Sequence, residues 1–170
     1  MKTKYVVDDG SKTPYVSDVA VPYLTSSTYQ LKSILGGKAN DALLSDGDSD
    51  IHLIHIARTG LPKDAMISLA KYLGITLDQI ALLLHTSYRN LARKEGQDMM
   101  DPHKSEMILE LATFAQRGVE VLGSHQSFKD WLQSPIRSLD FKTPLDYLDT
   151  TFGIKMLLKI LGRLEHGVFS

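Results

Sequence analysis

The sequence predicts an all-α protein, with a helix-turn-helix in its central part followed by a small helical domain at its carboxyl end. From Pro62 onward, apolar residues recur at helical spacing, and no run alternates as a half-buried strand would. Residues typical of helix starts and stops, such as Asp101-Pro102 and Gly123, divide this part of the chain into segments. The chain also carries no internal repeat and no low-complexity tract.

Residues 1–60 differ from the rest. Up to about Leu24, polar and β-branched residues alternate around Pro14 and Pro22, which indicates an extended arm that needs a partner surface to become ordered. Their role stays open.

Two short helices are expected within the second half of this region. The first spans Thr28–Leu35 and ends at Gly36-Gly37, where glycine readily takes the left-handed cap conformation. After a polar loop at 46–50, Asp50 suits the N-cap of a helix that continues through Arg58 and stops at Gly60.

The next two helices lie between Pro62 and Leu84. Pro62 suits a first helical position, and Gly74 ends that helix. Thr76 and Gln79 form a capping box for the second helix. The apolar faces consist of Met66, Leu69, Ala70 and Leu73 in the first helix, and of Ile80, Leu83 and Leu84 in the second.

The carboxyl-terminal part offers a long helix and several shorter elements. The long helix runs from Asp101-Pro102 to Gly123, and a short one ends at Ser134-Pro135. Thr143–Asp146 is another capping-box start. The last helix extends from about Gly153 to His166. Its flank carries a basic stripe of Lys155, Lys159 and Arg163.

Composition excludes several classes of function. The 170 residues suffice for one domain or two very small ones, and the net charge of -1 confines any nucleic-acid contact to a local patch. The absence of cysteine excludes disulfides, thiolate metal sites and cysteine nucleophiles. No apolar run approaches the ~20 residues that span a bilayer, and the amino terminus does not read as a signal peptide. We therefore expect a soluble, cytoplasmic protein without membrane contact.

An acidic run, Asp46, Asp48 and Asp50, imitates the first half of a calcium loop. Such a loop needs glycine at its sixth place and glutamate at its twelfth, which here hold Ile51 and Ala57. A solvated polar loop is the better interpretation.

Two further patterns also lack essential residues. His52 and His55 have no third ligand at useful spacing, and Gly36-Gly37-Lys38 lacks both the first glycine of a phosphate loop and the hydroxyl that would hold magnesium. No spacing places a nucleophile beside a base. We expect no metal, no cofactor and no catalytic residues, hence a protein that is not an enzyme.

The segment Leu77–Lys94 is typical of a helix-turn-helix, with a break at His85–Ser87 and a second helix that Ser87 would cap. Ile80, Leu84 and Leu91 would form the shared core, with the small Ala81 at the helix approach. The candidate DNA-binding residues are Ser87, Tyr88, Arg89, Asn90, Arg93 and Lys94. An ordinary helical hairpin with solvated basic residues fits the same spacing.

The turn departs from the usual pattern at two positions. His85 stands where glycine commonly provides a positive φ, and Thr86 stands where an aliphatic residue is usual. Retention of DNA binding therefore stays open.

Phe114, beside the apolar stripe of the long helix, leaves two interpretations. It widens a face that pairs with a second chain, as a repressor reading two half-sites requires, or it covers Phe128 and Trp131 in its own chain.

Several segments together resemble a known family, the Xre/ParS-type antitoxins (the MbcA/ParS/Xre family) of bacterial type II toxin-antitoxin systems. Its most specific part is the carboxyl end, TPLDYLDT at Thr143–Thr150 and LGRLEHGVFS at Leu161–Ser170. The other matching segments are GLPKDAMISLAKYLGITLDQIALLL at Gly60–Leu84, SYRNLARKEG at Ser87–Gly96 and WLQSP at Trp131–Pro135.

The resemblance implies a homodimeric antitoxin whose Xre-like helix-turn-helix domain, residues 61–100, handles dimerisation and operator binding. Residues 101–170 would bind a RES-domain toxin that consumes NAD, with the carboxyl tail blocking the toxin active site. The toxin-binding residues would be Lys159, Arg163, Glu165, His166, Gly167, Val168, Phe169 and Ser170. Alternatively, Val168 and Phe169 pack back onto the last helix, or the protein is a helix-turn-helix transcriptional regulator without a toxin partner.

Overall fold

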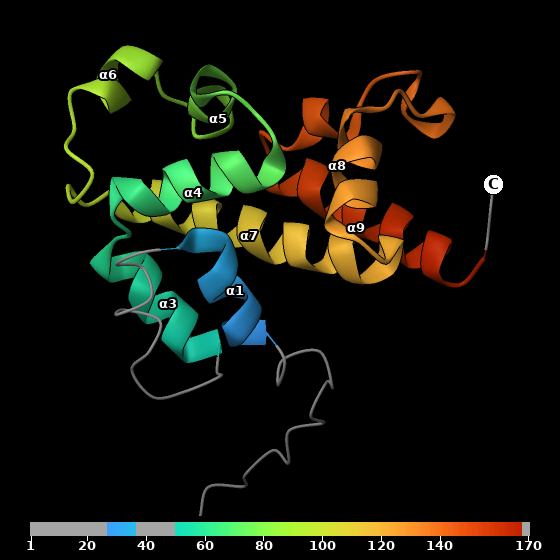
Figure 1. The fold of residues 1–170 in the computed structure, drawn as a ribbon, viewed down its shortest axis with the longest axis horizontal. Coiled ribbons are helices and arrows are strands. Elements are labelled where there is room, and N and C mark those ends of the chain that lie inside the picture. The colour runs from blue at the N-terminus through green and yellow to red at the C-terminus, as the bar shows by residue number, and fades with distance from the viewer. Residues whose placement is uncertain (1–26, 37–49, 168–170) are drawn as a thin grey trace, which may run out of the picture.

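Helix α7, Pro102–Leu122, runs through the middle of the molecule, and α1, α3, α4, α8 and α9 all pack against it (Figure 1). The computed structural model describes residues 27–36 and 50–167. The arm up to about Leu24, most of the polar loop at 46–50 and the tail residues Val168, Phe169 and Ser170 lie outside the described residues.

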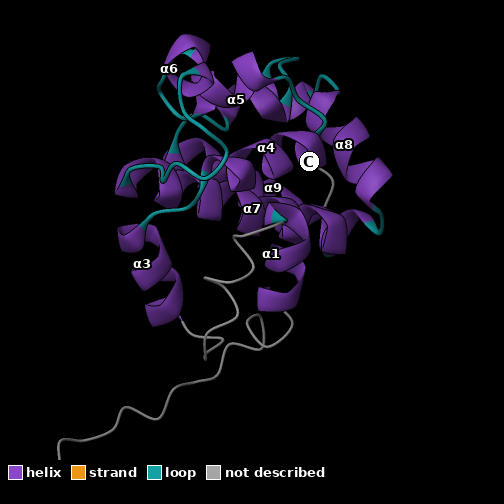
Figure 2. Cartoon of the chain, turned by 60° about the vertical axis from the view of Figure 1, so that its left-hand side comes forward, coloured by secondary structure: helices purple, strands orange, loops and turns teal. Residues whose placement is uncertain are grey.

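The described part of the chain is helical and contains no strand, as Figure 2 shows, so the all-α prediction is confirmed. Its only ladder contacts are two isolated bridges, Pro62 with Met99 and Ile136 with Lys142. The remaining elements are α1 (Ser27–Leu35), α3 (Asp50–Thr59), α4 (Lys63–Leu73), α5 (Leu77–Leu83), α6 (Tyr88–Ala92), α8 (His125–Gln133), η1 (Arg137–Leu139), η2 (Pro144–Tyr147) and α9 (Thr151–Glu165).

Most predicted helix ends are confirmed to within one or two residues. Gly60, Gly74 and Gly123 all have positive φ, at 100°, 71° and 80°, and each follows a helix. Pro62 is the N-cap of α4 and not its first residue, because its extended backbone (ψ 151°) pairs with Met99. The last helix starts at Thr151, earlier than expected, since Thr150 caps it by accepting a hydrogen bond from the Gly153 amide.

Helix α7 is buried around most of its circumference because small and large side chains alternate on it. Ala112, Ala115 and Gly118 let neighbouring helices approach closely, while Phe114 and Leu111 fill the space between them. Asp101 caps its first turn by accepting from the Lys104 amide at 3.0 Å. Helix α7 is therefore the element against which the helices around the core pack.

Phe114 lies inside the chain's own core, only 1% exposed. Its ring centroid is 5.9 Å from that of Phe128 and 6.3 Å from that of Trp131, within the range of favourable aromatic pairs. The second interpretation of Phe114 is therefore correct, and this residue does not widen a face for a second chain.

No single helix of the described residues is long and apolar enough to cross a membrane. Helices α4 and α5 reach the required length only in combination, and the chain bends by 108° between them.

The close approach of α8 to α7 yields a stability prediction for Gly118. A β-carbon there would lie 2.3 Å from Cδ2 of the buried Phe128, so Gly118→Ala overpacks the core and lowers the free energy of unfolding by about 1–3 kcal/mol in urea titration. Gly162→Ala is the matched control, since nothing lies within 4 Å of its β-carbon. It should stabilise α9 by up to about 1 kcal/mol. Equal effects of the two changes would contradict this packing.

Candidate functional site

The turn between α5 and α6 has the geometry of a helix C-cap in which the left-handed residue is not glycine. Thr86 N donates to Ala81 O at 2.9 Å, His85 N donates to Leu82 O at 3.0 Å, and His85 has φ +50°. These two hydrogen bonds are those of the Schellman motif. The expectation that His85 occupies a positive-φ position is thus confirmed.

Helix α6 is held on α5 by one buried residue, Leu91, at 3% exposure. It packs into the shared core that Ile80 and Leu84 were expected to form, and both of these are buried. Ser87 caps α6 as predicted, since its Oγ accepts from Asn90 N at 3.2 Å. The hydroxyl of Ser87 is therefore already engaged in capping α6.

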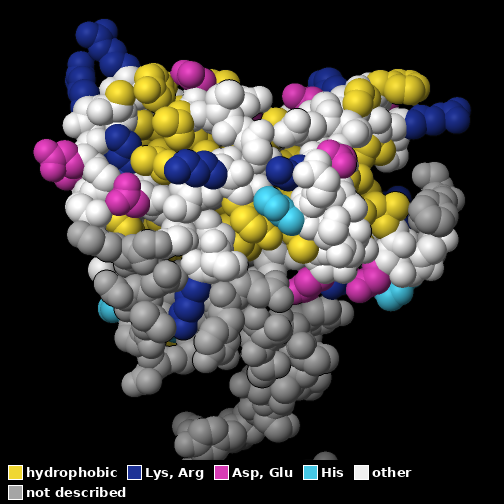
Figure 3. Space-filling model, viewed as in Figure 1, with side chains coloured by type: hydrophobic (Ala, Val, Ile, Leu, Met, Phe, Trp, Pro, Cys, Tyr) yellow, Lys and Arg dark blue, Asp and Glu magenta, His cyan; other side chains and the backbone are white. Residues whose placement is uncertain are grey.

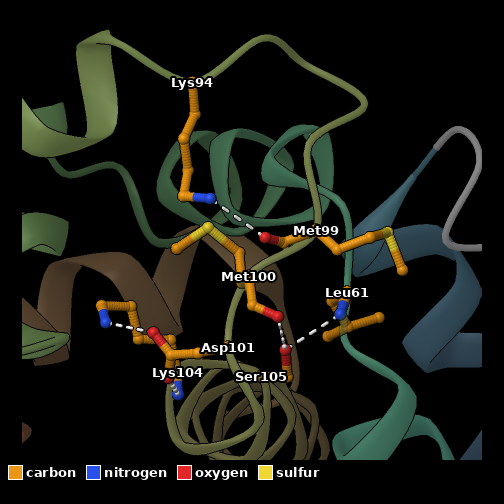
Figure 4. Close-up of polar contacts among 7 residues, drawn as sticks. All are labelled: Leu61, Lys94, Met99, Met100, Asp101, Lys104 and Ser105. Carbon is orange, nitrogen blue, oxygen red and sulfur yellow. Dashed lines mark hydrogen bonds and ion pairs between the residues drawn. The ribbon is translucent and has the colours of Figure 1, made fainter.

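The other residues predicted to read DNA separate into two groups. Tyr88, Arg89, Asn90 and Arg93 are exposed together on α6. On the face drawn in Figure 3, Lys and Arg side chains project at the upper left, over α6, and elsewhere lie in separate places. Lys94 is only half-exposed, and its Nζ donates to Met99 O at 3.1 Å (Figure 4). Its ammonium group is thereby bound to a backbone carbonyl of its own chain.

The return from α6 to α7 is fastened by a buried hydroxyl. Ser105 Oγ accepts from Leu61 N at 2.9 Å and donates to Met100 O at 3.4 Å (Figure 4). Next to it, Asp101 pairs with Lys104, and the hydrogen bond from the Lys104 side chain holds the pKa of the Asp101 carboxyl below its ordinary value. The start of α7 and the start of α4 are therefore locked together.

Helix α9 separates an apolar face from a basic one. Ile154, Leu157 and Leu161 are buried against α7, whereas Lys159, Arg163 and His166 are exposed. Since residues at i, i+4 and i+7 share a helix face, these three predicted toxin-binding residues lie together. Gly167, at φ +68°, begins the exit from the helix.

Glu165 differs from the other predicted toxin-binding residues because its carboxylate pairs with Arg117 of α7. Both side chains are partly exposed, at 39% and 25%. The pair fastens the carboxyl end of α9 to the central helix. Sequence reasoning missed this role because the two residues lie 48 positions apart in the chain.

Two hollows flank α9, and neither could be predicted from the sequence, because each is lined by several separate segments. A groove of about 740 Å³ lies among α3, α7 and α9, lined mainly by apolar side chains such as Leu53, Leu109 and Leu158. A cleft of about 620 Å³ lies between the α5–α6 turn, the start of α7 and the start of α9. Phe152, at the edge of this cleft, is 87% exposed.

Among the described residues, no three His, Cys, Asp or Glu side chains are grouped so as to hold a metal ion. The predicted site residues that are exposed form two cationic surfaces, one on α6 and one on α9.

Two family models match the chain, one over each of these surfaces. Residues 52–112 match the antitoxin Xre-like helix-turn-helix domain. Residues 117–167 match the antitoxin Xre/MbcA/ParS C-terminal toxin-binding domain. The boundary between the two models falls within α7.

Known proteins similar to the chain include two curated antitoxins and one solved structure. The antitoxin Xre of Yersinia enterocolitica is 28% identical over 120 residues, which is 69% of this chain and 81% of the relative. The antitoxin Xre of Photorhabdus laumondii is 26% identical over 121 residues, 70% of this chain and 82% of the relative. A chain in the crystal structure of the M. tuberculosis MbcT-MbcA toxin-antitoxin complex is 23% identical, with a TM-score of 0.47, and the match covers 64% of this chain and 96% of that one.

The Xre-like helix-turn-helix match includes α4, α5 and α6, and the toxin-binding match that follows it includes α8 and α9. The chain therefore belongs to the Xre/MbcA/ParS antitoxin family, and it is an antitoxin of a toxin-antitoxin system.

Proposed function

We propose that this antitoxin neutralises a RES-domain, NAD-consuming toxin by covering the toxin active site with the carboxyl end of α9 and the residues after it. We propose further that it represses its own operon as a homodimer, through α6. Its role in both cases is binding and not catalysis.

The observation that carries the toxin proposal is the exposed basic face of α9, formed by Lys159, Arg163 and His166. Ile154, Leu157 and Leu161 are buried on the other side of the helix, and Arg117 pairs with Glu165, so the basic face is presented in a fixed direction. Cationic groups held on a rigid helix suit a partner surface with complementary charge. The tail residues Val168, Phe169 and Ser170 belong to the same proposed surface.

The operator proposal is supported by the exposed side chains of α6. Arg89 and Arg93 suit phosphate or guanine contacts, Asn90 suits an adenine edge, and Tyr88 suits a phosphate. Ser87 and Lys94 remain in the proposal as flanking contacts, although both already make hydrogen bonds within the chain. The net charge of -1 agrees with a contact limited to this patch.

A homodimer follows from the same proposal, because an operator with two half-sites is read by two copies. Phe114 is no part of that contact, being buried in its own chain. A regulator without a toxin partner is disfavoured by the match of residues 117–167 to a toxin-binding domain.

The toxin-binding surface is tested by Lys159→Ala combined with Arg163→Ala. We expect the pair to lower affinity for the cognate RES-domain toxin by about tenfold or more, because two charge-assisted contacts are lost. Calorimetry on purified proteins and growth rescue on co-expression measure the effect. Arg89→Ala with Arg93→Ala is the matched control, since it removes two cations at the same spacing from α6. Unchanged toxin affinity in the α9 variant would contradict this assignment.

The operator surface is tested by the reverse comparison. Arg89→Ala with Arg93→Ala should weaken binding to the DNA upstream of the gene and flatten the salt dependence of log K by a slope of roughly 2, because two phosphate contacts are removed. Fluorescence anisotropy across a salt series measures this, with the α9 double variant as control. An unaltered slope in the α6 variant would show that α6 does not contact the backbone.

A further inference from the structure

Helices α4 and α5 end in the same hydrogen-bond motif but with different residues at its left-handed position. After α4, Ile75 N donates to Ala70 O and Gly74 N to Lys71 O, with Gly74 at φ +71°. After α5, Thr86 and His85 make the equivalent bonds, with His85 at φ +50°. Glycine adopts this conformation without strain, whereas a side chain adopts it at a cost. His85 therefore occupies a position where glycine would be locally more stable.

The imidazole makes a contact that glycine cannot make. His85 Nε2 lies 2.8 Å from the carbonyl oxygen of Asp149. Since a carbonyl only accepts, Nε2 donates this hydrogen bond. Asp149 directly precedes Thr150, the N-cap of α9, and it lies 64 positions from His85 in the chain. The bond thus joins the α5–α6 turn to the start of α9.

Few other contacts determine where α6 lies. Leu91 is its one buried residue, so the direction of the helix depends on the turn before it and on the return segment after it. The bond at the turn is exposed and borders the 620 Å³ cleft, at whose edge Phe152 is 87% exposed. It can therefore break without disturbing the buried core.

We propose that His85 is a positioning residue that couples the orientation of α6 to the position of the start of α9. A partner that displaces the start of α9 moves the Asp149 carbonyl away from His85. The turn then keeps the backbone strain of a side chain at positive φ but loses the hydrogen bond that offsets it. The proposal rests on the proposed function in one respect, namely that α6 reads DNA and α9 contacts the toxin. The coupling itself concerns the free chain and is measurable without either ligand.

The first test is amide hydrogen exchange of the full-length chain carrying His85→Gly or His85→Asn. Asparagine tolerates the left-handed conformation but is too short to reach Asp149. Loss of one hydrogen bond should raise exchange roughly two- to tenfold in the segment 147–153 for both variants. A purely local role of His85 predicts the opposite for His85→Gly, with slower exchange around the relaxed turn and no change at 147–153.

His103→Ala is the matched control, because His103 is an exposed imidazole that lines the same cleft from α7. It should leave exchange at 147–153 unchanged. If His85→Gly and His85→Asn also leave it unchanged, or if His103→Ala raises it equally, the proposal is overturned.

The second test concerns function and separates this proposal from the previous one. For the wild-type chain, saturation with the toxin should change the affinity for the upstream DNA fragment, and His85→Gly should abolish most of that change. A wild-type chain that does not bind the fragment would refute the operator proposal and leave the exchange result standing. A toxin-induced change that persists in His85→Gly would overturn the coupling.

Discussion

Burial of α7 on nearly all sides is the constraint on which the rest of the structure depends. Five helices share this one wall, and small residues such as Ala112, Ala115 and Gly118 are the reason they can approach it. Position 118 accepts only glycine without rearrangement, because the Phe128 ring occupies the space that a β-carbon at this position would need. Because interiors are close-packed, a change at this wall affects both matched domains.

The same constraint explains where the functional residues lie. Helix α9 uses one face for packing on α7 and α6 uses Leu91 for packing on α5, so the cations of both helices are left to solvent. In Figure 1, α6 lies at the upper left and the carboxyl end of α9 at the right. Two separate surfaces of like charge suit two separate partners. The His85–Asp149 hydrogen bond is a direct link between the elements that carry them.

Local chemistry made most of the fold predictable. The Thr76–Gln79 capping box and the glycine after α4 involve only residues close together in the chain, so the helix ends that they form can be predicted from the sequence. The burial of Phe114 was one of two open interpretations, because apolar spacing does not tell an internal face from an external one. Family resemblance, more than spacing, is the basis of the proposal that α9 contacts the toxin.

Contacts between distant segments could not be predicted. His85 was recognisable as an unusual residue for its turn, but its acceptor lies 64 positions away. The Arg117–Glu165 pair is hidden for the same reason. Lys94 is a candidate DNA-binding residue by its place in the sequence, which does not indicate that its ammonium group donates to the Met99 carbonyl.

The central claim is that one chain presents one surface to the toxin and another to DNA. Photo-crosslinking tests it most directly, with the reactive side chain placed at Ala92, exposed on α6, or at Gly162, where α9 has free space. In a mixture with toxin and upstream DNA, position 162 should capture the toxin alone and position 92 the DNA alone. Capture of the toxin from position 92, or of DNA from position 162, would contradict the account.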